Sequence, residues 1–261
     1  METIWITGAS SGIGEACAYR YAEAGKQLIL TSSQRDRLEI VAEQCLQKGA
    51  KSVQILPYDF RKNDGLELLV RTAWDTWGGV DVLFCNAGVS QRTTVEDTSM
   101  TMVRQLMEIN FFAPVILAKT ILPMMLSAGG GHIAVTTSIA GCFGFPLRCA
   151  YSASKHALYG FFETLQAEYY DRDIRVTMVC PGRVQTNISQ NALDKGGGRH
   201  GVMDPGQASG LTPEKAARQI VRAINKGKRE IYVGKKEILM VYVKRFFPGL
   251  CAKLARKIKA V

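Results

Sequence analysis

Short β-branched segments alternate with longer helical patterns from one end of this 261-residue chain to the other. Several of the short segments, such as residues 80–85, are apolar at nearly every position, as in a parallel strand covered on both faces. The predicted strands are 3–7, 27–31, 52–56, 80–85, 132–137, 174–180 and 230–233, and the predicted helices are 12–24, 35–48, 63–77, 100–126, 150–170 and 213–226. This alternation predicts an α/β fold of the Rossmann type, a doubly wound parallel sheet of about seven strands with helices on both faces.

No linker, repeat or low-complexity tract interrupts the alternation, so we expect one domain over residues 1–261. A long glycine-rich segment without clear periodicity, residues 187–211, follows the sixth predicted strand. Long loops inside compact domains are usually functional or disordered. We therefore expect a substrate-covering loop here.

The net charge of +10 is concentrated near the C-terminus. From residue 226 onward eleven Lys and Arg stand against two Glu, so nine of the ten net charges lie there. This excludes a basic surface for nucleic acid over the whole molecule. Within this basic C-terminal region, residues 235–261 form a basic tail. Its last part has Leu250, Leu254 and Ile258 at four-residue spacing and is predicted to form an amphipathic helix. It either docks on the domain or a subunit, or lies on an anionic membrane surface.

The seven cysteines favour a cytoplasmic protein with reduced thiols and no metal site, because their number is odd and no Cys-x-x-Cys occurs. No basic segment precedes the first apolar run, so we expect no signal peptide. The most apolar stretch, residues 111–126, contains Lys119 and two prolines. It is predicted to be a buried helix or an oligomer interface.

A glycine-rich turn, TGASSGIG at residues 7–14, follows the first predicted strand directly. Such a turn lets the backbone approach a pyrophosphate, which is stabilised by the free amides and positive end of the following helix. Tyr151 and Lys155 lie four residues apart on a predicted helix and therefore share one face. Ser138 follows the fifth predicted strand, at the sheet edge where ligands bind in open α/β folds.

With these features the chain resembles the short-chain dehydrogenase/reductase superfamily, in its single-domain branch. The resemblance includes the glycine motif, Asp59, Asn86-Ala87-Gly88, Asn110, Ser138, Tyr151 to Lys155, and Pro181-Gly182 followed by Thr186. It implies a catalytic tetrad of Asn110, Ser138, Tyr151 and Lys155. It also implies cofactor contacts from Gly8, Ser10, Ser11, Gly12, Ile13 and Gly14 in the turn, Asp59 and Phe60 near the adenine, Asn86, Ala87 and Gly88 near the adenosine ribose, Tyr151 and Lys155, Pro181 and Gly182, and Val184 and Thr186 near the nicotinamide amide.

Hydride transfer to a ketone leaves an alkoxide that must be protonated, and Tyr151 is the predicted acid/base. A phenol has an ordinary pKa of about 10, and the ammonium of Lys155 would lower it. Ser138 would donate a hydrogen bond to the substrate oxygen, and Asn110 would hold a water that connects Lys155 to solvent.

The cofactor is expected to be NADP, with NAD as the alternative. NAD-specific sites place an acid at the end of the second strand, whereas this chain has Ser32, Ser33 and Arg35 there. These could accept a 2′-phosphate. Against this, NADP-binding members of the family often carry a basic residue where Ser11 stands and an arginine where Ser33 stands.

The substrate is expected to be a lipophilic carbonyl or alcohol, because an apolar wall follows Ser138: Ile139, Ala140, Phe143, Phe145, Pro146 and Leu147. The tail is similar to those of steroid-dehydrogenase-like members, and the helices at 100–126 and 150–170 resemble those through which members form homodimers or homotetramers. Two alternatives are a 3-oxoacyl-carrier-protein reductase, whose basic surface would hold an acidic carrier, and a nucleotide-sensing module without turnover.

Overall fold

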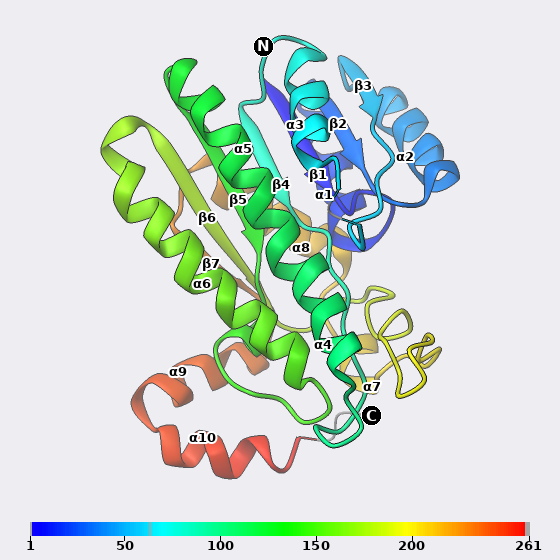
Figure 1. The fold of residues 1–261 in the computed structure, drawn as a ribbon, viewed down its shortest axis with the longest axis vertical. Coiled ribbons are helices and arrows are strands. Elements are labelled where there is room, and N and C mark those ends of the chain that lie inside the picture. The colour runs from blue at the N-terminus through cyan, green and yellow to red at the C-terminus, as the bar shows by residue number, and fades with distance from the viewer. Residues whose placement is uncertain (1, 63, 259–261) are drawn as a thin grey trace.

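A computed structural model describes residues 2–62 and 64–258, and its centre is a parallel sheet in the order β3-β2-β1-β4-β5-β6-β7 (Figure 1). The strands are β1 Thr3–Thr7, β2 Gln27–Thr31, β3 Ser52–Ile55, β4 Val82–Cys85, β5 Gly131–Thr136, β6 Ile174–Pro181 and β7 Glu230–Val233. The strand order reverses next to β1, as a doubly wound fold requires. The predicted fold class is confirmed.

Helices cover both faces of this sheet. They are α1 Gly12–Glu23, α2 Arg35–Gln47, α3 Leu66–Asp75, α4 Met100–Met107, α5 Ala113–Ser127, α6 Cys149–Tyr169, α7 Pro205–Ala208, α8 Pro213–Asn225, α9 Leu239–Phe246 and α10 Pro248–Ala255. The apolar faces of α1, α2 and α8 pack on one side of the sheet, and those of α3, α5 and α6 pack on the other. The predicted start of α3 at Asn63 lies outside the described residues.

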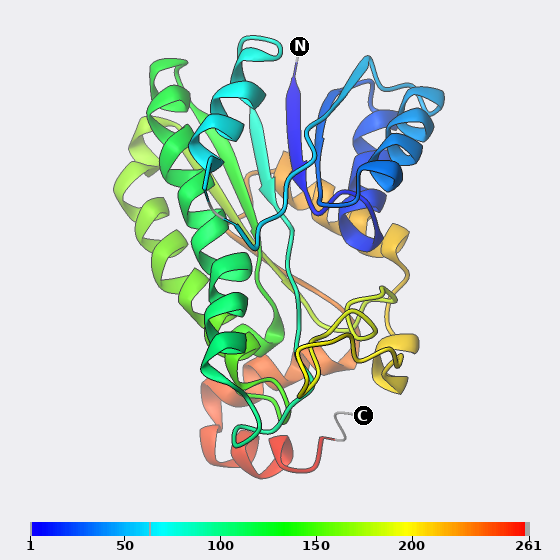
Figure 2. The same cartoon turned by 45° about the vertical axis from the view of Figure 1, so that its right-hand side comes forward.

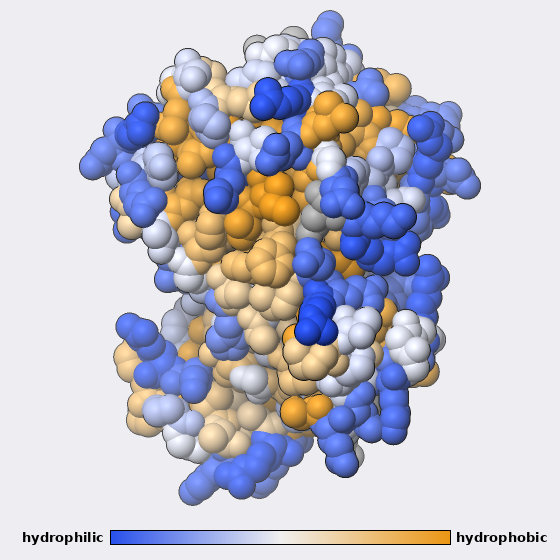
Figure 3. All heavy atoms as spheres, viewed as in Figure 1, coloured by the Kyte–Doolittle hydropathy of each residue, from blue (hydrophilic) through white to orange (hydrophobic). Residues whose placement is uncertain are grey.

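The helix predicted over residues 100–126 is interrupted by a π-helical turn, Glu108–Phe112, between α4 and α5. Such single-turn bulges occur frequently at functional sites, and this one contains Asn110. Met100–Ser127 is long and apolar enough to cross a membrane, and 39% of its most apolar 18-residue stretch is buried in the protein. Figure 3 shows apolar atoms gathered over the middle of the face on which α5 and α6 lie.

The 187–211 segment and the α9–α10 hairpin both lie at the carboxyl edge of the sheet (Figures 1 and 2). The hairpin packs on the domain through Val241, Cys251 and Ile258, which join a cluster with Ile139 and Phe143. Residues 259–261 of the predicted tail lie outside the described residues.

The predicted apolar stripe of the tail is wrong in detail. Leu250 is 49% and Leu254 38% exposed, whereas Cys251 is buried. Successive residues of a helix are rotated by about 100°, so the face of α10 that contains Cys251 turns Leu250 and Leu254 outward, and Ile258 contacts the domain from beyond the end of this helix. The tail therefore contacts the domain with one face and presents a second apolar face to solvent.

Candidate active site

A cavity of about 950 Å³ opens at the carboxyl edge of the sheet, between the strand ends, the 187–211 segment and the end of the tail. Most predicted site residues line it: Gly8, Ser10, Ser11, Gly12, Ile13, Ser32, Ser33, Asp59, Phe60, Asn86, Ala87, Gly88, Ser138, Tyr151, Lys155, Pro181, Gly182, Val184 and Thr186. Gly14, Arg35 and Asn110 are not among the lining residues. The fold thus brings together residues that are up to 178 positions apart, from Gly8 to Thr186.

The glycine turn exposes backbone to one end of the cavity at Gly8 and Gly12, beside the side chains of Ser10, Ser11 and Ile13. Gly8 and Gly12 have φ values of +66° and +60°, in the left-handed region that favours glycine. A Cβ on Gly14 would lie 2.3 Å from the carbonyl oxygen of Gly8, so this glycine sets the packing of the turn on α1.

The start of α1 suits an anionic ligand. Ser11, its N-cap residue, makes no capping hydrogen bond with its side chain, which leaves amides of the first turn available. Free amides and the positive end of the helix dipole bind phosphate groups well. The turn therefore fits the pyrophosphate of a dinucleotide.

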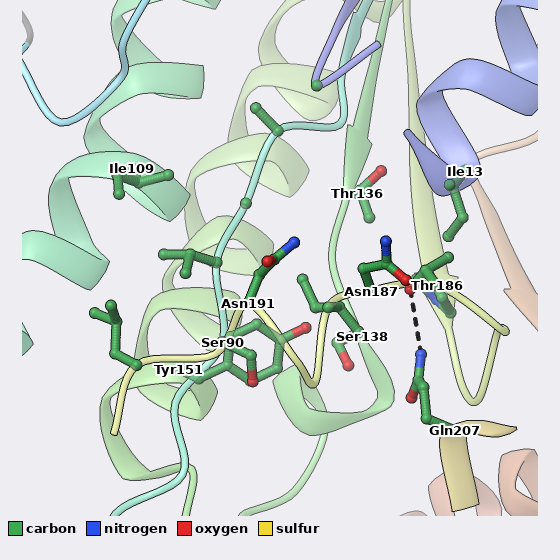
Figure 4. Close-up of a pocket in the computed structure, with 18 of the residues that line it drawn as sticks. Ile13, Ser90, Ile109, Thr136, Ser138, Tyr151, Thr186, Asn187, Asn191 and Gln207 are labelled. Atoms are coloured by element: carbon green, nitrogen blue, oxygen red, sulfur yellow. Dashed lines mark hydrogen bonds between the residues drawn. The ribbon is translucent and has the colours of Figure 1, made fainter. Parts of the chain in front are cut away.

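Tyr151, Ser138 and Lys155 come together at the other side of the cavity. The side chains of Tyr151 and Ser138 point into the same space, so the Ser138 hydroxyl lies beside the Tyr151 phenol (Figure 4). Lys155 Nζ donates to the carbonyl oxygen of Thr136 at 2.7 Å and lies 6.0 Å from the centre of the Tyr151 ring. The backbone N–H of Tyr151 donates to Gln91 Oε1 at 2.9 Å, which fixes the start of α6.

Burial raises the pKa of Tyr151, and the neighbouring Ser138 hydroxyl opposes this rise, as do the positive charges of Arg148 and Arg92. Burial also lowers the pKa of Lys155 to about 8. In the protein alone, the cations that act on the phenol are thus two arginines that the sequence analysis did not single out. The net result is a phenol that stays protonated at neutral pH.

Asn110 holds backbone segments together. Its Oδ1 accepts from Val89 N at 2.9 Å, and its Nδ2 donates to Val89 O at 2.9 Å and to Ser154 Oγ at 3.0 Å. Ser154 in turn donates to the carbonyl of Tyr151 at 2.8 Å. The side chain of Asn110 therefore connects the segment after β4 to the helix that carries Tyr151.

At the far end of the cavity, Ser32 Oγ lies 2.7 Å from Ser10 Oγ and accepts from Gln34 N at 3.3 Å. Arg35 points away: its side chain is 65% exposed and pairs with Glu39 on the same helix at 3.6 Å. The arginine that does line this end is Arg61. It binds Asp59 with its Nε and Nη2 and holds the pKa of that carboxyl below its usual range.

Only three of the six residues predicted to form the apolar wall line the cavity. Ile139, Ala140 and Phe145 line the cavity, whereas Pro146 and Leu147 do not and Phe143 packs beneath the α9–α10 hairpin. The polar residues of this region were not predicted from the sequence: Ser90, Arg92, Arg148, Asn187, Asn191, Asp204 and Gln207. Arg148 stands three positions before Tyr151, which was the one available signal.

The 187–211 segment is held against the cavity by polar contacts. Gln207 Nε2 donates to Thr186 Oγ1 at 3.4 Å, the dashed contact in Figure 4. Asp204 is bound by both Arg92 and Arg148. These contacts hold the 187–211 segment over the part of the cavity next to Tyr151.

The chain matches the family model for short chain dehydrogenases over residues 2–196. It therefore belongs to the short-chain dehydrogenase/reductase family of oxidoreductases. The predicted family and enzyme class are confirmed.

Named relatives cover most of the chain. It is 38% identical to "Dehydrogenase/reductase SDR family member 7B" of Xenopus laevis over 94% of this chain and 78% of the relative. It is 35% identical to "Dehydrogenase/reductase SDR family member 7" of Homo sapiens over 94% of this chain and 74% of the relative.

Solved structures share the fold. A short chain dehydrogenase/reductase from Burkholderia phymatum, in complex with NAD, aligns with a TM-score of 0.85 at 23% identity, covering 95% of this chain and 94% of the other. An alcohol dehydrogenase from Thermococcus sibiricus, complexed with 5-hydroxy-NADP, aligns with a TM-score of 0.76 at 28% identity, covering 90% and 97%.

Proposed function

We propose that this protein reduces a carbonyl group on a lipophilic substrate with NADPH, and that Tyr151 donates the proton. The observation that carries the proposal is the position of Tyr151 beside Ser138 in a large cavity that also contains a glycine turn suited to a pyrophosphate. Named relatives are dehydrogenases or reductases, which agrees with this reaction class.

The bound nicotinamide would supply the hydride. Ser138 would donate a hydrogen bond to the carbonyl oxygen and orient it toward the Tyr151 hydroxyl. Tyr151 would then protonate the developing alkoxide, since its phenol carries a proton at neutral pH. Lys155 would contact the nicotinamide ribose through donors not used by Thr136, and Asn110 would keep α6 in position. The 187–211 segment would exclude water from this space.

The preference for NADP is supported by neutral hydroxyls where NAD-specific sites place a carboxylate, since Ser32 and Ser33 line the cavity at this end. Arg61 is the nearby cation, although it pairs with Asp59. Related structures contain NAD or a derivative of NADP. Dissociation constants of NADPH and NADH test the preference, and tighter NADH binding would reverse it.

A lipophilic substrate is supported by the apolar residues that remain in the wall, including Ile139, Phe145 and Ile258 of the tail. The direct test is a cofactor-oxidation screen of purified protein over lipophilic ketones, aldehydes, sugars and acyl thioesters, with NADPH and NADH. Turnover of acyl-carrier substrates alone would instead favour a 3-oxoacyl-carrier-protein reductase. Oxidation with any substrate would exclude a nucleotide sensor without turnover.

We also propose a homodimer or homotetramer that pairs through α5 and α6. The apolar atoms on this face support it, since contiguous apolar patches mark interaction sites (Figure 3). Light scattering coupled to size exclusion gives the mass directly, and a monomer at micromolar concentration would contradict the proposal.

For the tail we propose contact between a cytoplasmic enzyme and an anionic membrane surface. Phe246 and Phe247 are 69% and 63% exposed, and Lys244, Arg245 and Lys253 lie on the same hairpin. Exposed aromatic groups beside cations are typical of interfacial helices. The double variant F246S/F247S should lose sedimentation with phosphatidylserine vesicles, whereas Leu68→Ser, which removes an equally exposed apolar side chain from α3, should not.

A further inference from the structure

Two arginines share a single carboxylate beside Tyr151. Arg92 binds Asp204 through its Nε at 3.2 Å and through its Nη2, and Arg148 Nη2 binds Asp204 Oδ2 at 2.8 Å. The side chains of Arg92, Arg148 and Asp204 are 3%, 14% and 8% exposed, and all three residues line the cavity. The cluster joins three separate segments, after β4, before α6 and within 187–211.

This cluster has a net charge of +1 in a buried place. Arginine stays protonated in proteins, so two guanidinium groups face one carboxylate. In the described part of the chain, the ion pairs of Arg92 and Arg148 all end on Asp204. A buried charge without a counterion is costly, and it is stabilised when an ion of opposite sign pairs with it.

The two arginines differ in how many of their N–H donors form hydrogen bonds. Arg92 Nη1 also donates to Ser90 Oγ at 2.9 Å and to the carbonyl of Gln91 at 2.6 Å, so four of its five N–H donors are engaged. Arg148 makes one short bond, to Asp204, and a long one to the carbonyl of Pro146 at 3.4 Å. Its other three N–H groups have no acceptor among the described residues.

Arg148 is also close to the reacting groups. Its guanidinium carbon lies 5.8 Å from the centre of the Phe145 ring, which lines the apolar wall, and its charge acts on the Tyr151 phenol. A ligand that reaches both Tyr151 and Phe145 therefore passes the unused donors of Arg148.

We propose that Arg148 is a substrate-specificity residue that binds a carboxylate on the substrate, while Arg92 and Asp204 hold it in place. One uncompensated positive charge matches one singly charged carboxylate better than a doubly charged phosphate. The substrate class is then a lipophilic ketoacid, with its ketone at Tyr151, its carboxylate at Arg148 and its alkyl part along Ile139 and Phe145. This inference rests on the proposed carbonyl reduction.

The test compares medium-chain ketoacids that differ in the spacing between ketone and carboxylate, each beside its methyl ester. For the best-spaced acid, the wild-type protein should show a higher kcat/KM than for the ester. Arg148→Met should lower kcat/KM for that acid by about 10- to 100-fold more than for the ester, the usual effect of losing a hydrogen bond to a charged group, because the loss of positive charge beside Tyr151 acts on both substrates alike. Arg148→Lys should restore part of the loss.

The control variant is Arg104→Met, which removes one positive charge from the exposed face of α4, outside the cavity lining. This variant should leave the ratio of kcat/KM for the acid to kcat/KM for the ester unchanged. Arg148→Met should fold, because Arg92 and Asp204 then form a neutral pair.

A binding measurement separates this inference from the proposed reaction. Calorimetry of each acid and ester with the protein and the oxidised cofactor, a combination that cannot react, should show the same selective loss in Arg148→Met. If that loss occurs and no ketone is turned over, carbonyl reduction fails and the carboxylate site stands. If ketones are turned over but Arg148→Met weakens the binding of acids and esters equally, Arg148 only holds the 187–211 segment, and the carboxylate site is refuted.

Discussion

Replacing Tyr151 by Phe removes one oxygen atom and tests the assignment of the proton donor. The ring keeps its place because the backbone N–H of residue 151 still donates to Gln91, and the Ser154 bond to its carbonyl also remains. The lost hydroxyl should cost no more than about 1 kcal/mol of folding stability, which is the usual contribution of one hydrogen bond. The variant should therefore fold and bind NADPH as the wild type does.

The catalytic effect should be much larger. A positioned general acid contributes about 10²- to 10⁴-fold, which corresponds to about 3–5 kcal/mol of activation free energy. Without the phenol, Ser138 is the hydroxyl left beside the carbonyl oxygen, and an aliphatic hydroxyl is a far weaker acid than a phenol. We expect kcat to fall by this factor while the dissociation constant of NADPH stays within about twofold.

The assay is the absorbance of NADPH under saturating ketone, beside fluorescence titration of NADPH. The control is Tyr170→Phe, which removes the same oxygen from a 42% exposed tyrosine just beyond the end of α6, outside the cavity lining. It should retain full activity. Undiminished turnover in Tyr151→Phe, with Tyr170→Phe as the reference, would refute the assignment.

Three further predictions concern stability. Burial lowers the pKa of Lys155 from 10.5 to about 8, so between these pH values the unfolded chain holds a proton on Lys155 that the folded protein has lost. The free energy of unfolding of the wild type should therefore rise with pH from 8 to 10.5. Measured by urea unfolding, the rise should be up to about 3 kcal/mol larger than that of Lys155→Met. Burial lowers the pKa of His132 from 6.5 to about 4, so wild-type stability should fall as pH drops through that range, and a pH series of thermal unfolding should show a smaller fall for His132→Gln. Gly14→Ala should cost about 2–4 kcal/mol and weaken NADPH binding, because its Cβ would meet the Gly8 carbonyl, while Gly160→Ala, in open space on α6, should be neutral or stabilising in the same urea unfolding.

The sheet was predictable because its strands are buried on both faces and therefore have uninterrupted apolar runs. The predicted bounds of β1, β2 and β7 agree with the structure. The site's position followed from the same pattern, because parallel strands place their carboxyl ends, and so Ser138 and Asn86, at one edge.

Other features depend on packing that leaves no local signal. The π-helical turn at Asn110 contains no glycine or proline that would mark it in the sequence. Arg35 has the right sequence position for a cofactor contact but turns to Glu39, whereas Arg61, a loop residue, reaches the cavity.

The tail shows the same limit. Its apolar residues lie on two faces of the hairpin, and only the docked structure distinguishes Cys251, which faces the domain, from Leu250, which faces solvent. The Arg92–Asp204–Arg148 cluster joins residues 112 positions apart, which no periodicity predicts.

The most direct test of the central claim is the fate of a deuterium label carried on the nicotinamide ring of NADPH. Purified protein is incubated with this cofactor and a ketone that the screen identifies, and the alcohol is analysed by mass spectrometry. Hydride transfer beside Tyr151 and Ser138 predicts an alcohol with a single deuterium on the former carbonyl carbon, and much less of it from Tyr151→Phe. An alcohol without label, or equal label from the variant, would contradict the account.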